Sequence, residues 1–178
     1  MEKILAVTTL AQTKKFIIEG VDIDFANGKQ TQFERMKFQW TGRGVAVVAL
    51  QKEWFDAFVY LIEHFCVGTE QREFMLPGGH REEGDTLIEA ANKELQEEIG
   101  YGSQDISFLL NINSPGYIAG NSTICLAQDL YPSVLSGDEI EDIIVHKILL
   151  SQAIAMIWQG IITDGKTIAW LLYVDSLS

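Results

Sequence analysis

The sequence has few cysteines and few basic residues. Its two cysteines, Cys66 and Cys125, stand apart among apolar residues without the paired spacing of a metal site, so we expect two reduced thiols in the core. The chain contains 13 lysines and arginines and 25 aspartates and glutamates, which gives a net charge of -12. Nucleic-acid binding needs clustered Lys and Arg against the phosphates, so this composition argues against it.

Long apolar runs are also missing. None approaches the roughly 20 residues that span a bilayer, and the first residues, Met1-Glu2-Lys3-Ile4, lack the apolar region of a secretory signal. We therefore expect a cytoplasmic protein with no membrane partner. With 178 residues, 47% of them hydrophobic, the chain can form one domain with a sizeable core, with or without an appendage.

The most informative stretch is residues 78–101, GGHREEGDTLIEAANKELQEEIGY. Glu94, Glu97 and Glu98 lie at i, i+3 and i+4, so on a helix they share a face. Three anions at that spacing repel one another by a few tenths of a kcal/mol per pair, roughly. The cluster therefore indicates a bound cation.

Local signals define the ends of this helix. Thr86 and Glu89 form a capping box, and Gly100 stands where a left-handed residue would end the helix. The preceding Leu76-Pro77-Gly78-Gly79 is typical of a strand that exits into a tight loop. The apolar stripe expected to face the core, with the glutamates on an adjoining face, consists of Ile88, Ala91, Leu95 and Ile99.

The rest of the chain alternates strands with a few helices. Residues 16–38 alternate like strands around Asn27-Gly28, a strong hairpin signal, so we expect an N-terminal antiparallel hairpin region over residues 1–42 that serves as a dimer contact. Residues 43–178 form the second region, an α/β sandwich. Its strands are expected at 44–50, 56–65, 73–76, 106–113, 123–130 and 143–149, and its C-terminal helices at 151–158, capped by Ser151, and at 166–174.

The stretch at 78–101 resembles the Nudix box, G-x5-E-x7-R-E-U-x-E-E-x-G-U, in which U is bulky and apolar. The matching residues are Gly79, Glu94, Leu95, Glu97, Glu98 and Gly100, whereas Asp85 and Lys93 replace the first Glu and the Arg of the motif. The resemblance implies a Nudix-type α/β/α sandwich with a mixed sheet and a homodimer. Residues 113–146 further resemble the subgroup that hydrolyses ADP-ribose and other ADP compounds.

What the resemblance implies about chemistry can be assigned to residues. Mg²⁺ or Mn²⁺ would be held by the Gly78 carbonyl, Glu94, Glu98 and Glu141, with Glu139 as general base and Glu97 as a further catalytic residue and candidate ligand. From the residues alone, the acidic segment around Glu139 and Glu141 is more ordinarily a solvated turn. The substrate would be a small molecule linked to a nucleoside diphosphate, such as ADP-ribose, NADH or a diadenosine oligophosphate, cleaved to release AMP. No substrate-binding residue can be assigned.

Three departures from the family pattern affect this hypothesis. Lys93 keeps a positive charge but loses the fork with which Arg would hold the metal-binding glutamates, and Asp85 is one methylene shorter than Glu, so we expect slower catalysis. Glu63 stands on a strand where related enzymes carry an Arg that contacts substrate, and an acid there would repel an anion. The alternatives are a pyrophosphatase of nucleoside triphosphates or nucleotide sugars, and a non-catalytic nucleotide-sensing module.

Overall fold

The computed structural model describes residues 1–39, 44–114, 116–137 and 142–176. The chain divides into two compact units. Unit 1 contains Met1–Arg43 and Asn111–Ser122, and unit 2 contains Gly44–Leu110 and Thr123–Ser178. The first division lies next to the boundary expected at residues 42 and 43, but unit 1 also takes a second segment from the middle of the chain. The role of residues 1–42 in dimerisation stays a prediction.

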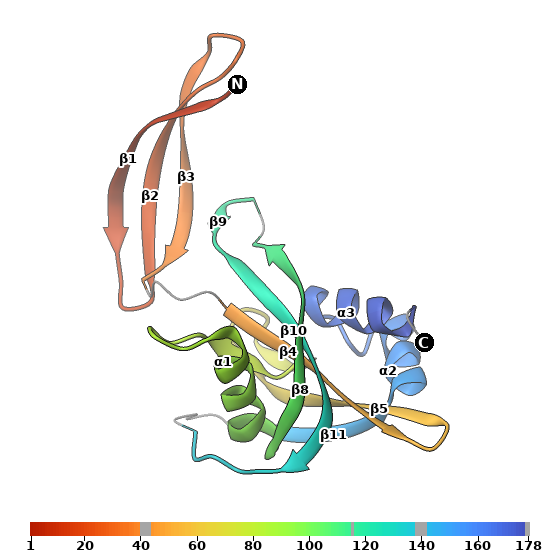
Figure 1. The fold of residues 1–178 in the computed structure, drawn as a ribbon. Coiled ribbons are helices and arrows are strands. Elements are labelled where there is room, and N and C mark those ends of the chain that lie inside the picture. The colour runs from red at the N-terminus through yellow and green to blue at the C-terminus, as the bar shows by residue number, and fades with distance from the viewer. Residues whose placement is uncertain (40–43, 115, 138–141, 177–178) are drawn as a thin grey trace. The chain divides into compact units, whose positions relative to one another are not determined.

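Unit 1 is a four-stranded sheet in the order β1-β2-β3-β9 (Figure 1). The strands are β1 (Lys3–Gln12), β2 (Phe16–Asp24), β3 (Gln30–Phe38) and β9 (Ile118–Ala119). Neighbours are antiparallel from β1 to β3, whereas β9 joins β3 in parallel. The expected hairpin is confirmed: the Lys29 N–H donates to Asn27 Oδ1 and Gly28 has a φ of 78°, which glycine adopts without steric cost.

Strand β1 was not expected from the sequence. Its ten residues are all exposed, and apolar residues such as Ile4 and Leu5 are adjacent, so the strand lacks the alternation that marks a half-buried strand. Antiparallel pairing with β2, from Lys3 opposite Asp24 to Gln12 opposite Ile17, holds the strand in place.

Unit 2 is built on a seven-stranded mixed sheet with the main order β11-β5-β4-β10-β8. Two short strands extend it, β6 beside β5 and β7 beside β4. The strands are β4 (Gly44–Glu53), β5 (Asp56–Cys66), β6 (Gln71–Met75), β7 (Gly78–His80), β8 (Tyr101–Asn113), β10 (Asn121–Pro132) and β11 (Ile144–Leu149).

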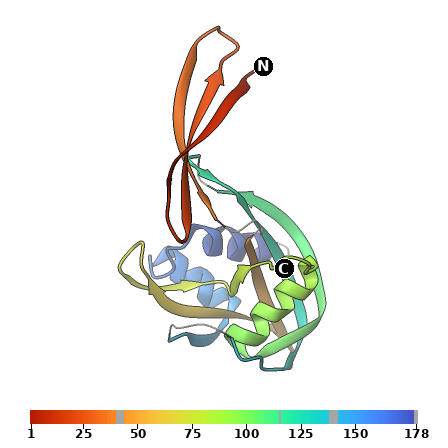
Figure 2. The ribbon, with the colours of Figure 1, turned by 90° about the vertical axis from the view of Figure 1, so that its left-hand side faces the viewer.

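Helices cover both faces of this sheet (Figure 2). On one face, α1 (Leu87–Glu94) continues into a π-helical turn, η1 (Leu95–Ile99), and packs on alternate residues of β4 and β5 such as Val47 and Tyr60. On the other face lie α2 (Leu150–Trp158) and α3 (Gly165–Asp175), where the buried Thr167 hydroxyl accepts a hydrogen bond from the Leu76 N–H. The α/β/α sandwich expected from the sequence is confirmed.

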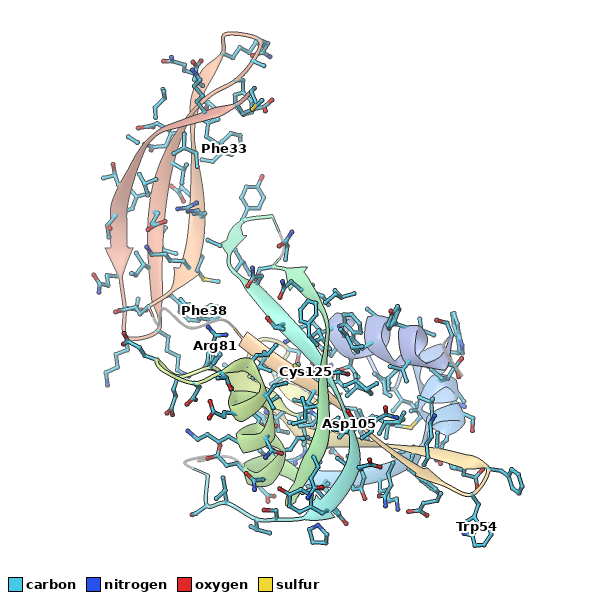
Figure 3. The ribbon with its side chains drawn as sticks, viewed as in Figure 1. Phe33, Phe38, Trp54, Arg81, Asp105 and Cys125 are labelled. Carbon is cyan, nitrogen blue, oxygen red and sulfur yellow. The ribbon has the colours of Figure 1, made fainter. Side chains whose placement is uncertain are left out.

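Some details differ from the expected pattern. Ser151 does not cap α2, because the helix begins one residue earlier and Leu149 stands at its cap without a side-chain bond. Of the two thiols, Cys125 is fully buried within the unit 2 sheet (Figure 3), whereas Cys66 is only half-buried at the end of β5. Across the described ranges, no helix is long and apolar enough to cross a membrane.

Candidate active site

The two glycines of the box form a strand where a loop was expected. In β7, Gly78 pairs with Ala46 of β4, and its φ is 157°. A Cβ on Gly78 would lie 2.3 Å from the Val45 carbonyl oxygen and 2.7 Å from the Ala46 Cα, and backbone atoms cannot move aside. Glycine is therefore required for β7 to lie this close to β4.

The box helix begins and ends as its sequence indicates. Glu89 N–H donates to the Thr86 hydroxyl at 3.2 Å, and the Glu89 carboxylate accepts from the Thr86 N–H at 2.9 Å. Hydrogen bonding of the Glu89 carboxylate by the Thr86 N–H, and secondly by the Thr86 hydroxyl, lowers the pKa of Glu89. At the other end Gly100 is left-handed, with a φ of 72°, and its N–H donates to the Leu95 carbonyl.

Three of the four residues expected to face the core, Ala91, Leu95 and Ile99, are buried, and the helix differs from the expectation only in its first turn. Ile88 was expected to face the core but is exposed, because Leu87 takes the inward position instead. From Leu87 the buried face continues at helical spacing through Ala90 and Ala91 to Leu95. Glu94 and Glu98 lie on this same face, each only 9% exposed, so they are not on a separate, solvated face.

The π-helical turn brings two of the three glutamates to the same place. A bond from residue 100 back to residue 95 spreads the last turn over more residues than an α-helix would, and such turns are frequent at functional sites. Glu98 accepts a hydrogen bond of 2.7 Å from the Gly78 N–H. A Cβ on Gly79 would lie 2.5 Å from Glu94 Oε1. Both carboxylates therefore lie against the Gly78-Gly79 backbone.

This arrangement suits a hard divalent cation in its donor chemistry. Carboxylate and backbone oxygens are the ligands that Mg²⁺ prefers, and two buried carboxylates with the glycine backbone supply them. In the described part of the chain, no three His, Cys, Asp or Glu side chains gather in metal-binding geometry. Glu97 is more exposed than Glu94 and Glu98, and Glu139 and Glu141 lie outside the described residues.

Comparison with known proteins identifies the family. Residues 3–35 match a NudE-type Nudix hydrolase N-terminal domain, and residues 40–126 match a NUDIX domain. The ADP compounds hydrolase NudE of Escherichia coli K12 is 39% identical over 139 residues, which are 78% of this chain and 72% of that protein. The chain belongs to the Nudix hydrolases.

Two further relatives agree with this assignment. The ADP-ribose pyrophosphatase of Bacillus subtilis is 26% identical over 98% of this chain and 92% of its own length. A crystal structure of an ADP compounds hydrolase superposes with a TM-score of 0.86 at 32% identity, covering 99% of this chain and 93% of that one. Nudix hydrolases generally depend on divalent metal ions.

Around the Nudix box, Lys93 has a different partner from the one expected. Its Nζ lies 2.8 Å from Glu82 Oε1, and this bond, more than the nearby charges of Glu97 and Asp85, raises the pKa of Lys93. Both members of the pair are substantially exposed. Lys93 therefore ties the end of α1 to the loop that precedes it, with Glu97 and Asp85 within electrostatic range.

Glu63, which was expected to repel an anionic substrate, is paired with cationic and imidazole groups. Arg72 Nε donates to Glu63 Oε1 at 3.0 Å, and His146 Nε2 lies 2.9 Å from Glu63 Oε2. Because alternate residues of a strand face opposite sides, Glu63 lies on the face of β5 away from Tyr60 and the Nudix helix. Sequence reasoning missed this group, since it depends on the pairing of three strands and His146 is 83 residues from Glu63.

The structure thus brings together some, but not all, of the site residues expected from the sequence. Gly78, Glu94 and Glu98 are brought together, and Glu97 lies beside them on the more exposed side of the helix. The segment that carries Glu139 and Glu141 is not described, but the residue directly after it is. The Asp142 carbonyl accepts a hydrogen bond of 2.8 Å from Arg72.

Proposed function

We propose that this Nudix hydrolase cleaves the pyrophosphate of ADP-linked compounds and releases AMP. The observation that carries the proposal is the pair of buried carboxylates, Glu94 and Glu98, against the Gly78-Gly79 backbone. The similarity to an ADP compounds hydrolase and an ADP-ribose pyrophosphatase supports ADP-ribose as substrate. Its products would be AMP and ribose 5-phosphate.

The metal is proposed to be Mg²⁺ or Mn²⁺, held by the Gly78 carbonyl, Glu94, Glu98 and Glu141. Such an ion polarises the phosphoryl oxygens and lowers the pKa of bound water. The Gly78 N–H fixes Glu98, and the absence of a side chain on Gly79 leaves room for the Glu94 carboxylate.

We propose acid–base roles for two residues, Glu139 and, on the box helix, Glu97. Glu139 accepts the proton of the attacking water, and Glu97 assists from the exposed side of the helix. Lys93, which is bonded to Glu82, offsets part of the negative charge of the cluster, and Asp85 acts on the cluster only through its attraction to Lys93. A chain with a net charge of -12 has little positive surface for a diphosphate, so the bound cation also compensates for repulsion.

The test is a substrate panel with purified protein. ADP-ribose, NADH, diadenosine oligophosphates, a nucleotide sugar and a nucleoside triphosphate are each incubated with Mg²⁺ or Mn²⁺, with and without EDTA, and AMP is measured by chromatography. We expect metal-dependent AMP release from ADP compounds. Preferential turnover of the triphosphate or the sugar nucleotide would move the assignment to those alternatives, and absence of turnover throughout would refute it.

A matched pair of variants links turnover to the site. Glu98→Gln keeps an oxygen for the Gly78 N–H but removes the charge, so we expect kcat to fall by more than tenfold while the fold is retained. Glu89→Gln is the control on the same helix, because glutamine also completes a capping box. Equal activity of both variants would contradict the proposed ligand role.

We also propose that the protein is a homodimer joined through residues 1–42. Strand β1 is an edge strand that exposes Ile4, Leu5, Val7 and Leu10, and exposed apolar edge strands are templates for pairing with another chain. Light scattering should give twice the chain mass for the wild type and the single mass for Val7→Lys. Val67→Lys, at an equally apolar but separate exposed position, is the control. A monomeric wild type would refute this proposal.

A further inference from the structure

The π-helical turn η1 is bonded to the chain that directly follows β10. The Gln96 carbonyl accepts a hydrogen bond of 3.1 Å from the Leu135 N–H, and the Gly100 carbonyl accepts one of 3.0 Å from the Ser133 N–H. The last carbonyls of a helix have no partner within the helix, so groups elsewhere must satisfy them. Here residues 133–135 supply two such groups, and this short segment therefore lies against the end of the box helix.

A side-chain bond makes this contact specific to the sequence. Gln96 Nε2 donates to the Ser133 hydroxyl at 2.6 Å, and the pair is partly buried. The two backbone bonds need only a main chain beside the turn, which any sequence provides. The bond between Gln96 and Ser133 determines which residues meet. We refer to the Gln96–Ser133 bond and the two backbone bonds together as the clasp.

The clasp favours a π-helical turn over an α-helical one. In η1 the Gly100 N–H bonds back five residues to the Leu95 carbonyl, a form that is rare in proteins. An α-helical turn would move this bond to the carbonyl four residues back, that of Gln96. The Gln96 carbonyl already accepts from Leu135, and its side chain already donates to Ser133. Both bonds therefore compete with rewinding of the turn.

Gln96 and Glu98 hold the turn from opposite sides. Residues two apart on a helix do not share a face, because each residue advances by about 100° around the axis. Glu98 is 9% exposed and accepts its bond of 2.7 Å from the Gly78 N–H, whereas Gln96 is bonded to Ser133. Two contacts on opposite sides restrict rotation of the turn about its axis. Such rotation would move Glu98 away from Gly78.

We propose that Gln96 and Ser133 are positioning residues that hold η1 in the form that places Glu97 and Glu98 for the metal ion. This inference rests on the proposed function, in which Glu98 is a metal ligand. Neither side chain touches a reacting atom, and both act through the turn. One hydrogen bond can shift the equilibrium of the turn by no more than its own contribution, so its loss should weaken metal binding by about 3- to 10-fold.

Calorimetric titration with Mn²⁺ in the absence of substrate tests the proposal. Gln96→Met keeps the length of the side chain but removes the donor, and Ser133→Ala removes the acceptor. Each should raise the Kd for Mn²⁺ by about 3- to 10-fold. The double variant should bind no more weakly than the weaker single variant, because both changes break the same bond. Ser133→Thr keeps the hydroxyl, so its Kd should stay within about twofold of the wild type.

Kinetics with ADP-ribose should show the same dependence on metal. In Gln96→Met the Mg²⁺ concentration that gives half-maximal rate should rise by the factor measured for Mn²⁺. The KM for ADP-ribose at saturating Mg²⁺ should stay within about twofold, because the side chain acts on the metal site and does not contact the substrate. A raised KM with an unchanged requirement for Mg²⁺ would contradict the proposal.

Asn92→Ala is the matched control on the same helix. Asn92 Oδ1 accepts a hydrogen bond of 2.8 Å from the Ser103 N–H, which ties α1, and not η1, to β8. Its loss should lower the midpoint of thermal unfolding at least as much as Gln96→Met does, yet keep the Kd for Mn²⁺ within about twofold. Equal losses of Mn²⁺ affinity in the two variants would show a general effect of lower stability and would overturn the proposal.

Hydrogen exchange in the metal-free protein supplies a readout that depends on neither metal nor turnover. Amides of residues 98–100 should exchange at least threefold faster in Gln96→Met than in the wild type, while those of residues 91–94 keep their rates. Unchanged exchange or unchanged Mn²⁺ affinity would overturn the proposal. If Gln96→Met fails to fold, Ser133→Ala, which lies outside the helix, decides. A wild type that binds Mn²⁺ without turnover would refute the proposed function alone, whereas one that binds no Mn²⁺ would refute both.

Discussion

Replacing Gly79 with alanine should impair the proposed metal site without unfolding the protein. The new Cβ would lie 2.5 Å from Glu94 Oε1 and 2.8 Å from its Cδ. Carbon atoms pack at about 3.5 Å or more, so the carboxylate must retreat by about 1 Å. A displacement of that size in a reacting geometry can cost about 100-fold. We therefore expect a 10- to 100-fold loss of kcat/KM, about 1.4–2.7 kcal/mol.

The effect on folding should be small because the obstructing atoms end a flexible side chain. Alanine also lowers the entropy of the unfolded chain, by about 0.4–1 kcal/mol, which offsets part of the strain. The midpoint of thermal unfolding in EDTA should then move by no more than about 4 °C. Calorimetric titration with Mn²⁺ should show weaker binding, and kcat/KM should recover partly at high metal concentration.

Gly78→Ala is the matched comparison one residue earlier. Its Cβ would meet backbone atoms of Val45 and Ala46 that cannot move, so we expect a destabilisation of about 3 kcal/mol and a midpoint lower by about 6–12 °C. The two glycines should thus separate a loss of function from a loss of fold. Wild-type Mn²⁺ affinity and kcat/KM in Gly79→Ala would refute the reasoning that Glu94 is a metal ligand constrained by this glycine.

Three further predictions concern the helix and the core. Thr86→Ala removes the cap and should destabilise by about 1 kcal/mol, a midpoint shift of about 2–4 °C by calorimetry; no shift would contradict the capping role. Lys93→Arg adds a fork that can bond Glu82 and Glu97 together, so kcat at low Mg²⁺ should rise, and an unchanged rate would argue against a supporting role. Burial raises the pKa of Cys125 to about 11, from 9.0 for a free thiol. The unfolded thiol therefore ionises first, and stability should fall as pH rises from 9 to 11, with a shallower fall in Cys125→Ala.

Features set by local chemistry could be predicted from the sequence. The capping pair of Thr86 and Glu89, the left-handed Gly100 and the Asn27-Gly28 turn each depend on neighbours within a few residues. The order of strands and helices predicted the α/β/α sandwich, because elements of several residues have a hydrophobic pattern that can be recognised in the sequence. The burial of Glu94 and Glu98 could not be predicted in this way, because it depends on their contact with the backbone of Gly78 and Gly79.

Features set by pairing between distant segments could not be predicted. Strand β7 depends on the approach of Gly78 to Ala46 of β4. The π-helical turn depends on where the helix must end against the sheet. Arg72 and Asp142 are 70 residues apart in the chain, so no local pattern relates them. The sequence could predict that Glu94 and Glu98 lie close together because they follow one another on the same helical stretch, whereas it could not place the groups around them.

Glu63 shows how a partner on an adjacent strand changes the expected effect of a charged residue. Taken alone, the acid at position 63 predicts a weaker hold on an anionic substrate. Here Arg72, nine residues on, neutralises that acid from the adjacent strand, so the pair adds no net charge to this region. The remaining donors of Arg72 then reach the Asp142 carbonyl. The Glu63 carboxylate therefore orients the Arg72 side chain, and Glu63 need not repel an anionic substrate.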